Sequence, residues 1–205
     1  MSGVCIVVGA GFFDGFKRKP QPRDYIIAAD GGYEYCRRRG VTPDLVVGDF
    51  DSLGHVPDVP NLEQMPVEKD ETDMFHAINR GLERGYSSFE IYGGAGGERE
   101  DHTIANLQCL MYLAKRGAKC VMYGKGIAYA AISDGVMDFP PECSGTISIF
   151  CLDGKAEGVT LRGLKYPLTD YTMRSDYPIG VSNSFTGEAA AVAVKKGCLV
   201  IIYNI

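Results

Sequence analysis

The stretch that decides the fold is Tyr25–Gly32, which reads YIIAADGG. Its apolar part has the length and the residue types of a buried strand, and the Asp-Gly-Gly that follows ends the strand before a helical segment, residues 32–39, which stops at Gly40. The pattern recurs at Leu45–Gly48, where Asp49 follows an apolar run. Strands that alternate with helices predict a parallel sheet with covering helices.

The same reading extends over the rest of the chain. Further strands are expected at 4–9, 89–92 and 120–123, and further helices from about residue 72 to Gly85 and after Asp101. Beyond about residue 128 no long helical period occurs; strands are expected at 146–152, 158–161, 189–194 and 199–203, with Lys195–Gly197 as a hairpin turn. We therefore expect an α/β N-terminal domain with a mostly parallel sheet covered by helices, residues 1–127, and an all-β sandwich C-terminal domain, residues 128–205.

The composition sets limits on the class of protein. The 205 residues are 45% hydrophobic and 23% charged, which is typical of a globular protein. A net charge of -5 without any long Lys/Arg run argues against nucleic acid or an anionic membrane as a partner. No apolar stretch approaches the roughly 18 residues of a membrane span. The first residues lack a basic leader region and are interpreted as a strand, so we expect a cytoplasmic protein.

The cysteines and histidines do not indicate a metal centre or a disulfide framework. The seven cysteines include no Cys-x-x-Cys pair, and an odd number favours reduced thiols. The three histidines are not spaced near a cysteine pair, so a zinc site is not indicated.

Acidic residues form four short clusters. The clusters contain Asp30; Asp49 and Asp51; Lys69, Asp70, Thr72 and Asp73; and Arg99, Asp101 and His102. Most of them follow an apolar run or begin a helix, and open α/β sheets bind their ligands where strands end. Converging carboxylates suggest a hard divalent cation and a phosphorylated substrate.

Two of these clusters also have a simpler explanation. Within a regular strand, Asp49 and Asp51 would lie on one side and share a cation, but Asp is also common in turns. An N-cap by itself would explain Thr72 and Asp73 at a helix start. Several acids in one place repel one another, however, unless a cation lies among them.

Glycines mark three further segments. Gly93–Gly97 follows a predicted strand and leads to Arg99, so that phosphate can approach the backbone closely; a merely flexible loop is the alternative. The chain has no Walker-type phosphate loop, and Gly9–Gly11 begins a dinucleotide fingerprint that Asp14 leaves incomplete. Gly180–Gly187 is expected to be an ordinary loop.

Taken in order, these motifs resemble those of the thiamin pyrophosphokinases along nearly the whole chain. The motifs are Ala-Asp-Gly-Gly at 29–32, Pro-Asp-Leu-Val-Val-Gly-Asp-Phe-Asp-Ser at 43–52, Lys-Asp-Glu-Thr-Asp at 69–73, Arg-x-Asp-His at 99–102 with Asn106, and Gly-x-Ser-Asn at 180–183. The resemblance implies transfer of the pyrophosphoryl group of ATP to the hydroxyl of thiamin, which gives thiamin diphosphate and AMP. It also implies Mg²⁺, an ATP-binding catalytic N-terminal domain, a thiamin-binding C-terminal domain and a homodimer with the thiamin site near the junction of domains and subunits.

The resemblance assigns roles to particular residues. It implies that Asp49, Asp51 and Asp73 are catalytic and face Mg²⁺ and phosphate, and that Ser182 and Asn183 bind thiamin. It implies an ATP site formed by Asp30, Lys69, Thr72, Arg99, Asp101, His102 and Asn106. Either Asp49 or Asp73 can accept the proton of the thiamin hydroxyl. Because the chain has no Trp, Tyr166, Tyr171 or Phe185 is expected to supply an aromatic face.

Two rival functions stay open at this point. A diphosphokinase with a pterin alcohol as acceptor would need a similar acidic cluster, although Gly-x-Ser-Asn favours thiamin. A non-catalytic nucleotide-binding or thiamin-sensing module would bind ligand without turnover, which the full set of acids argues against.

Overall fold

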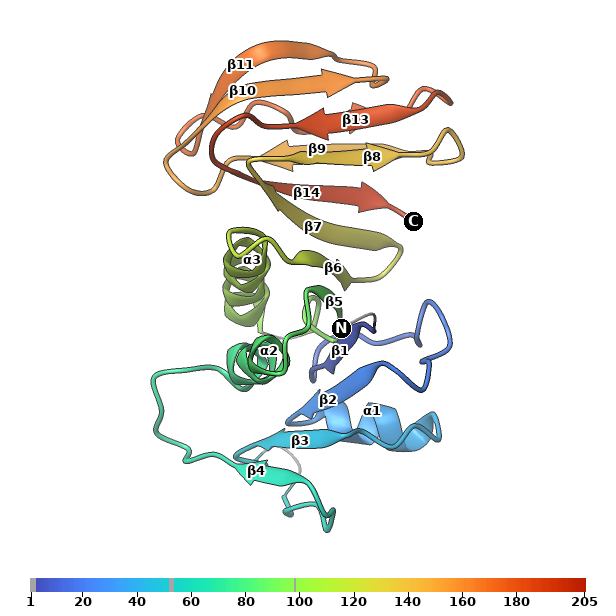
Figure 1. The fold of residues 1–205 in the computed structure, drawn as a ribbon, viewed down its shortest axis with the longest axis vertical. Helices are drawn as coiled ribbons and strands as arrows, with labels where there is room; N and C mark the ends of the chain where they lie inside the picture. Colours follow the sequence, from blue (N-terminus) through green and yellow to red (C-terminus); the bar gives the residue numbers. More distant parts are fainter. Residues whose placement is uncertain (1–2, 52–53, 98) are drawn as a thin grey trace. The chain divides into compact units, whose positions relative to one another are not determined.

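The chain folds into two compact units. In the computed structural model, which describes residues 3–51, 54–97 and 99–205, the first unit comprises Met1–Cys109 with Met122–Lys125 and the second comprises Leu110–Val121 with Gly126–Ile205 (Figure 1). We describe each unit by itself.

The first unit contains the predicted parallel sheet. Its strands are β1 (Cys5–Val8), β2 (Tyr25–Ala29), β3 (Leu45–Gly48), β4 (Leu62–Gln64) and β5 (Ser88–Tyr92). They lie in the order β5-β1-β2-β3-β4, and every adjacent pair is parallel. All residues of β1, β2 and β3 are buried, because a parallel sheet covered on both faces has no solvent side. This is why these strands are continuous apolar runs in the sequence.

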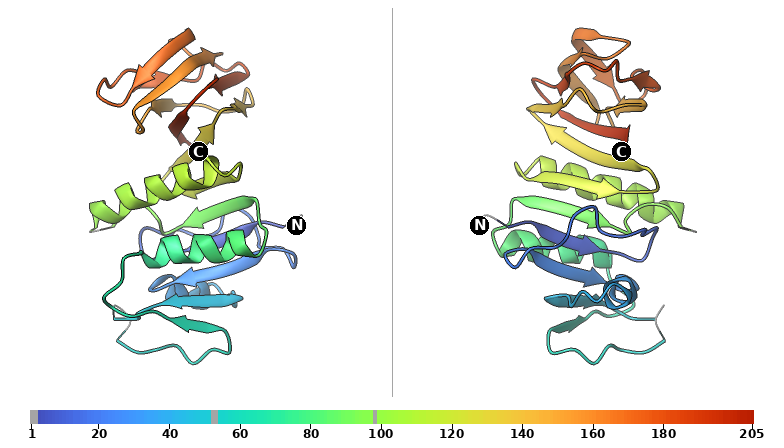
Figure 2. Two further views of the ribbon diagram at one scale, coloured as in Figure 1. Left: turned by 60° about the vertical axis from the view of Figure 1, so that its left-hand side comes forward. Right: turned by 90° about the vertical axis from the view of Figure 1, so that its right-hand side faces the viewer.

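Helices connect the strands. They are α1 (Gly32–Arg38), α2 (Asp73–Glu83) and α3 (Glu100–Ala114). Figures 1 and 2 show α1 and α2 on opposite faces of the parallel strands. Both α3 and the next strand, β6 (Lys119–Tyr123), include residues of both units. The prediction of parallel strands with covering helices is confirmed.

The second unit is built from antiparallel strands. They are β7 (Ile127–Ser133), β8 (Val136–Phe139), β9 (Thr146–Phe150), β10 (Lys155–Arg162), β11 (Leu168–Arg174), β12 (Asn183–Ser184), β13 (Ala190–Ala193) and β14 (Cys198–Asn204). One group has the order β12-β9-β14-β7 and the other β11-β10-β13-β8. Ile149 and Ile201 from the first group share a buried core with Leu161 and Val192 from the second. The two groups therefore pack face to face.

The prediction of a hairpin at Lys195–Gly197 is wrong. The strands on either side of this segment, β13 and β14, belong to different groups: β13 pairs with β8 and β10, whereas β14 pairs with β7 and β9. The segment instead crosses from one group to the other, and Lys196 forms an isolated bridge with Glu157. Short apolar runs on either side of Lys-Lys-Gly carry no information about which partners they pair with.

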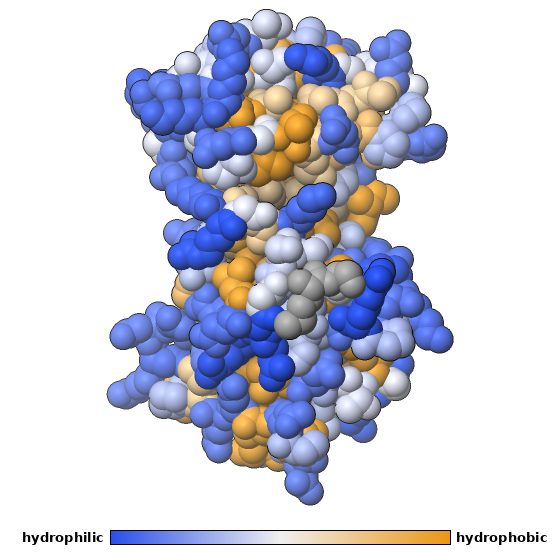
Figure 3. All heavy atoms as spheres, viewed as in Figure 1, coloured by the Kyte–Doolittle hydropathy of each residue, from blue (hydrophilic) through white to orange (hydrophobic). Residues whose placement is uncertain are grey.

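The surface is mainly polar on the face that Figure 3 shows, with smaller apolar areas between hydrophilic side chains. Among the described residues, no helix combines the length and the apolar character needed to cross a membrane.

Candidate active site

The strand order places a crevice between the ends of β1 and β5. The chain runs outward from β1 through β2, β3 and β4 and then returns to the other side of β1 as β5. The connections that follow β1 and β5 therefore lead to opposite sides of this pair of strands, which makes it a topological switch point. The loops contact each other through backbone hydrogen bonds, from Gly9 N to Tyr92 O (2.8 Å) and from Gly11 N to Gly93 O (2.8 Å). A pocket of about 670 Å³ lies here, within the first unit.

Glycine is required where these two loops touch. Gly93 has φ +61, and a Cβ on it would lie 2.1 Å from the carbonyl oxygen of Gly9. A Cβ on Gly11 would lie 2.8 Å from the carbonyl oxygen of Gly93. Gly9–Gly11 thus belongs to the wall of the pocket, although it does not complete a dinucleotide fingerprint.

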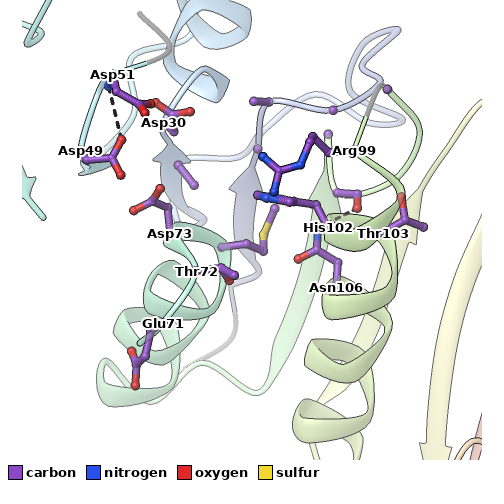
Figure 4. Close-up of a pocket in the computed structure, with 18 of the residues that line it drawn as sticks. Asp30, Asp49, Asp51, Glu71, Thr72, Asp73, Arg99, His102, Thr103 and Asn106 are labelled. Carbon is purple, nitrogen blue, oxygen red and sulfur yellow. Dashed lines mark hydrogen bonds between the residues drawn. The ribbon is translucent and has the colours of Figure 1, made fainter. Parts of the chain in front are cut away.

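Carboxylates from two strand ends meet on one side of the pocket. Asp30 follows β2, and Asp49 and Asp51 follow β3 (Figure 4). Each offers an oxygen, and these three oxygens lie within 4.8 Å of one another. This group is suited to a hard cation, because carboxylate oxygens are the ligands that Mg²⁺ and Ca²⁺ prefer.

A turn, and not the strand pleat, brings Asp49 and Asp51 together. Strand β3 ends at Gly48, and Phe50 between the two acids has φ +62. The Asp51 backbone N–H donates to Asp49 Oδ1 (3.3 Å), so the turn interpretation of this motif is confirmed, and the shared cation stays a prediction. Phe50 is buried, which fixes the unfavourable backbone conformation, and Asp30 is also left-handed, with φ +49. Such conformations gather at functional sites.

Lys69 is the cation that the structure itself places among the acids. Its Nζ lies 2.9 Å from Asp49 Oδ2 and 2.7 Å from Asp73 Oδ1, and the three side chains are only 12–19% exposed. The hydrogen bond from Lys69 lowers the pKa of Asp49. Burial alone would lower the pKa of Lys69, but its hydrogen bonds to Asp49 and Asp73 raise it overall.

The first turn of α2 supplies Asp73 and its neighbours. Thr72 is the N-cap, and its hydroxyl oxygen accepts a hydrogen bond from Phe75 N (3.1 Å). Burial raises the pKa of Asp73; Lys69 opposes this shift and Asp49 adds to it. Asp70 lines the pocket near this helix start.

The other side of the pocket is formed by Arg99 and the first turns of α3. Figure 4 shows Arg99, His102 and Asn106 opposite the acids. Asn106 is buried, and its Nδ2 donates to the carbonyl oxygen of Gly94 (2.7 Å), which ties α3 to the glycine loop. Arg99 forms an exposed ion pair with Asp101 (2.6 Å), and the hydrogen bond from Arg99 lowers the pKa of Asp101 to about 2.

Ser182 and Asn183 belong to the second unit. Ser182 is exposed and left-handed, with φ +58, and its backbone N–H donates to Ser148 Oγ (3.1 Å). Asn183 is 2% exposed, and its carboxamide is hydrogen-bonded to the backbone of Tyr166 and Ser184.

The structure brings most of the predicted nucleotide-site residues together. The residues that line the pocket include Asp30, Asp49, Asp51, Lys69, Thr72, Asp73, Arg99, His102 and Asn106. Asp101 does not line the pocket and reaches it only through Arg99. Sequence reasoning missed Thr103 and Met74, which also line it. Helical periodicity from His102 and Asp73 identifies the helices but does not show which of their residues face the pocket.

Known proteins with similar sequences support one family. Residues 16–122 match a family described as "Thiamin pyrophosphokinase, catalytic domain", and residues 136–199 match "Thiamin pyrophosphokinase, vitamin B1 binding domain". The thiamine pyrophosphokinase of Bacillus subtilis (strain 168) is 28% identical over 183 residues, which cover 86% of this chain and 85% of the relative.

Solved structures agree in fold. The crystal structure of the Bacillus subtilis thiamine pyrophosphokinase has a TM-score of 0.85 at 24% identity and covers 99% of both chains. A thiamin pyrophosphokinase family protein from Enterococcus faecalis has a TM-score of 0.79 at 27% identity, with 98% of this chain and 99% of that chain covered. With both family regions present in order along one chain, this protein belongs to the thiamin pyrophosphokinase family.

Proposed function

We propose that the pocket of the first unit binds ATP and Mg²⁺ for the activity of this family. The protein is a thiamin diphosphokinase, which transfers the pyrophosphoryl group of ATP to the hydroxyl of thiamin and releases AMP. The observation that carries the proposal is the arrangement of the pocket: carboxylates from Asp30, Asp49 and Asp51 converge on one side, and the guanidinium of Arg99 lies opposite.

The acids of the pocket fit a hard cation. Three carboxylate oxygens within 4.8 Å of one another would repel if nothing lay between them. We propose Asp49, Asp51 and Asp73 as the acids that face Mg²⁺. Asp30 shares the converging group with Asp49 and Asp51 and is proposed as a further ligand, whereas Asp73 lies outside that group, with its Oδ1 2.7 Å from Lys69 Nζ. Mg²⁺ bound there neutralises negative charge on the polyphosphate.

The remaining pocket residues bind and orient the nucleotide. Arg99 and Lys69 carry the positive charge that phosphate oxygens need, and the glycines of the two loops let the polyphosphate approach the backbone. Thr72, His102 and Asn106 complete the proposed ATP site, and Asp101 contributes by pairing with Arg99. Positioning of this kind supplies much of the rate in phosphoryl transfer.

We propose Asp73 as the group that accepts the proton of the thiamin hydroxyl. A base has to take up a proton during the reaction, and Asp73 lies beside Asp49 on the acidic side of the pocket, with both carboxylates against the Lys69 ammonium. Asp49 is the alternative acceptor, and Asp73→Asn and Asp49→Asn compared for single-turnover rate separate the two.

The second unit is proposed to bind thiamin at Ser182 and Asn183. The family region that matches residues 136–199 is the one described as binding vitamin B1, and it includes both residues. The N-terminal ATP-binding domain, residues 1–127, and the thiamin-binding domain, residues 128–205, are proposed as the functional division of the chain. A homodimer and a cytoplasmic location belong to the same proposal. Light scattering tests the dimer, for which a molar mass of about twice 22.3 kDa is expected.

One experiment tests the nucleotide site. Asp51→Asn removes a charge from the converging acids with little change in shape, so thiamin-dependent release of AMP is expected to fall by at least about a hundredfold, the range of a lost charge-stabilising group. The matched control is Asp58→Asn, which changes an exposed acid of the same unit that does not line the pocket. A folded Asp51→Asn protein with the wild-type rate and Mg²⁺ dependence would contradict the proposal.

A further inference from the structure

Lys69 lies on the connection between β4 and α2, and its side chain joins acids that come from two different elements. Its Nζ is 2.9 Å from Oδ2 of Asp49, which follows β3, and 2.7 Å from Oδ1 of Asp73, in the first turn of α2. The lysine side chain is 12% exposed, and the two carboxylates are 13% and 19% exposed. The ammonium is therefore largely removed from water and is held by two carboxylates.

The bond to Lys69 engages Asp73 away from the acids that converge nearby. Asp30, Asp49 and Asp51 each offer an oxygen within 4.8 Å of the others, and Asp73 is outside this group. In Figure 4 the Asp73 carboxylate points from the start of α2 toward the acids that follow β2 and β3. Charge-assisted hydrogen bonds such as the one between Lys69 and Asp73 are the strong ones. Asp73 is thus committed to the ammonium and not to the converging group.

A divalent cation among these acids and the Lys69 ammonium would repel each other. Both are positive, and both are attracted by the carboxylate of Asp49, which bonds to Lys69 and also belongs to the converging group. Because these side chains are poorly exposed, water and salt screen the repulsion only weakly. Metal and ammonium therefore compete for the same carboxylates as long as the ammonium has no other anionic partner.

A bound nucleotide would give the ammonium such a partner. A lysine carries a compact charge at the end of a flexible four-carbon chain, so it can exchange one anion for another without a change in the backbone. Lys69 lines the pocket that is proposed to hold the polyphosphate, whose oxygens accept charge-assisted hydrogen bonds. Transfer of Lys69 to a phosphate oxygen would leave Asp49 and Asp73 to the metal.

We propose that Lys69 is an exchangeable counter-ion, which pairs with Asp49 and Asp73 when nucleotide is absent and moves to phosphate oxygens when nucleotide and Mg²⁺ bind. This inference rests on the proposed ATP and Mg²⁺ site of the first unit. It extends the role of Lys69 from phosphate binding to control of metal binding, because the acids take up the metal mainly together with nucleotide. By linkage, each ligand then raises the affinity for the other through this side chain.

The first test measures the binding of Mn²⁺, a paramagnetic substitute for Mg²⁺, to the full chain without nucleotide by electron paramagnetic resonance. Lys69→Met removes the ammonium and is expected to bind Mn²⁺ about tenfold more tightly than the wild type, within the usual range of coupling between ligands. Lys69→Arg keeps the charge and is expected to retain the wild-type affinity. Equal Mn²⁺ affinities for Lys69→Met and the wild type would overturn the proposal.

The matched control is Lys17→Met. Lys17 is an exposed lysine of the same unit that also pairs with an aspartate, Asp14 (3.2 Å), and neither residue lines the pocket. Its replacement changes the net charge of the protein by the same amount as Lys69→Met and should leave the Mn²⁺ affinity unchanged. An equal gain in affinity in both variants would overturn the proposal, because the effect would then come from net charge alone.

The second test repeats the titration with saturating α,β-methylene ATP, in which the bond that the reaction breaks is replaced by a stable one. In the wild type this analogue is expected to raise the Mn²⁺ affinity in two ways, through its own phosphate oxygens and by drawing Lys69 away from the acids. Only the first way remains in Lys69→Met, so the gain there should be about tenfold smaller. An equal gain in both proteins would overturn the exchange of partners.

A double-mutant cycle tests whether Asp73 is an acid that Lys69 keeps from the metal. Without nucleotide, Asp73→Asn is expected to change the Mn²⁺ affinity less than about threefold in the wild type, where loss of the carboxylate is offset by a weaker hold on Lys69. In Lys69→Met, where that carboxylate is available, Asp73→Asn is expected to lower the affinity about tenfold. Equal effects in the two backgrounds would overturn the release of Asp73 by Lys69.

The inference and the proposed function fail in different ways. If Lys69→Met does not fold, Lys69→Gln, which is shorter and polar, replaces it in all three measurements. A folded wild-type protein that releases no thiamin-dependent AMP and binds neither Mn²⁺ nor the analogue would overturn the proposed function itself. Wild-type turnover together with Mn²⁺ affinities that do not depend on the residue at position 69 would overturn only the inference.

Discussion

Replacing Lys69 by Met should make the stability of the protein depend on Mg²⁺. Methionine has nearly the length of lysine but no charge, so the variant removes the ammonium that lies 2.9 Å from Asp49 and 2.7 Å from Asp73. The two carboxylates would then face each other without a counter-ion. In the absence of metal we expect the variant to unfold more easily than the wild type, and we expect Mg²⁺ to recover much of that loss.

The size of the effect follows from burial and distance. A charge pair at about 4 Å contributes on the order of 4 kcal/mol at an effective dielectric constant of about 20. Removing Lys69 loses two such attractions. Two effects oppose this loss: the free-energy cost of desolvating the ammonium disappears, and Asp73, whose pKa is raised by burial, can bind a proton instead. We therefore expect a net loss of about 2 kcal/mol, in the range for hydrogen bonds to charged groups. For a chain of this size that lowers Tm by about 4–8 °C.

The assay is thermal unfolding at pH 7 without nucleotide, first in a chelator and then with millimolar MgCl₂. The matched control is Lys195→Met, which breaks an exposed ion pair to Asp170 (2.7 Å) and should change Tm little in either buffer. The reasoning would be refuted if Lys69→Met unfolded at the wild-type temperature and responded to Mg²⁺ as the wild type does.

Two further predictions concern stability. Thr72→Ala removes the hydroxyl that caps α2 at Phe75 N and should lower the free energy of unfolding by about 1 kcal/mol in urea titration, whereas Thr72→Ser should not; equal losses in both variants would contradict a capping role. Burial alone would raise the pKa of Glu63, but hydrogen bonds from His76 and Arg80 lower it overall. Above about pH 4.3 the wild type should therefore be more stable than Glu63→Gln, and this difference should decrease as the pH falls through the pKa of Glu63 in the folded protein. Thermal unfolding over a range of pH measures the difference, and a pH-independent difference would contradict this prediction.

Much of the fold follows from local pattern. The predicted bounds of β2 and β3 agree with the structure, because strands buried on both faces of a parallel sheet are continuous apolar runs. Strands that are partly exposed were missed, such as β4, which has three residues and no buried one, and β11, where one residue in seven is buried. Partial exposure removes the apolar run that would identify such strands.

The candidate site divides in the same way. The sequence predicted that acids after strand ends would converge, since carboxyl ends of parallel strands share one edge of the sheet, and Asp30, Asp49 and Asp51 do so. It did not predict the left-handed turn at Phe50 that aligns Asp49 with Asp51, because that backbone conformation is unfavourable by itself and depends on burial of the Phe50 side chain.

The sequence by itself determined the helices, the fully buried strands, their order and the residue types available for chemistry, because strand and helix periodicity, caps and glycines act over a few neighbouring residues. Only the tertiary structure decided which groups are bonded to which: Lys69 lies between Asp49 and Asp73, and Asn183 holds residue 166. The physical reason is that burial and hydrogen-bond partners arise from segments that are distant in the sequence. The sequence specifies the charge of a side chain, but the packing of the folded chain determines the environment of that charge.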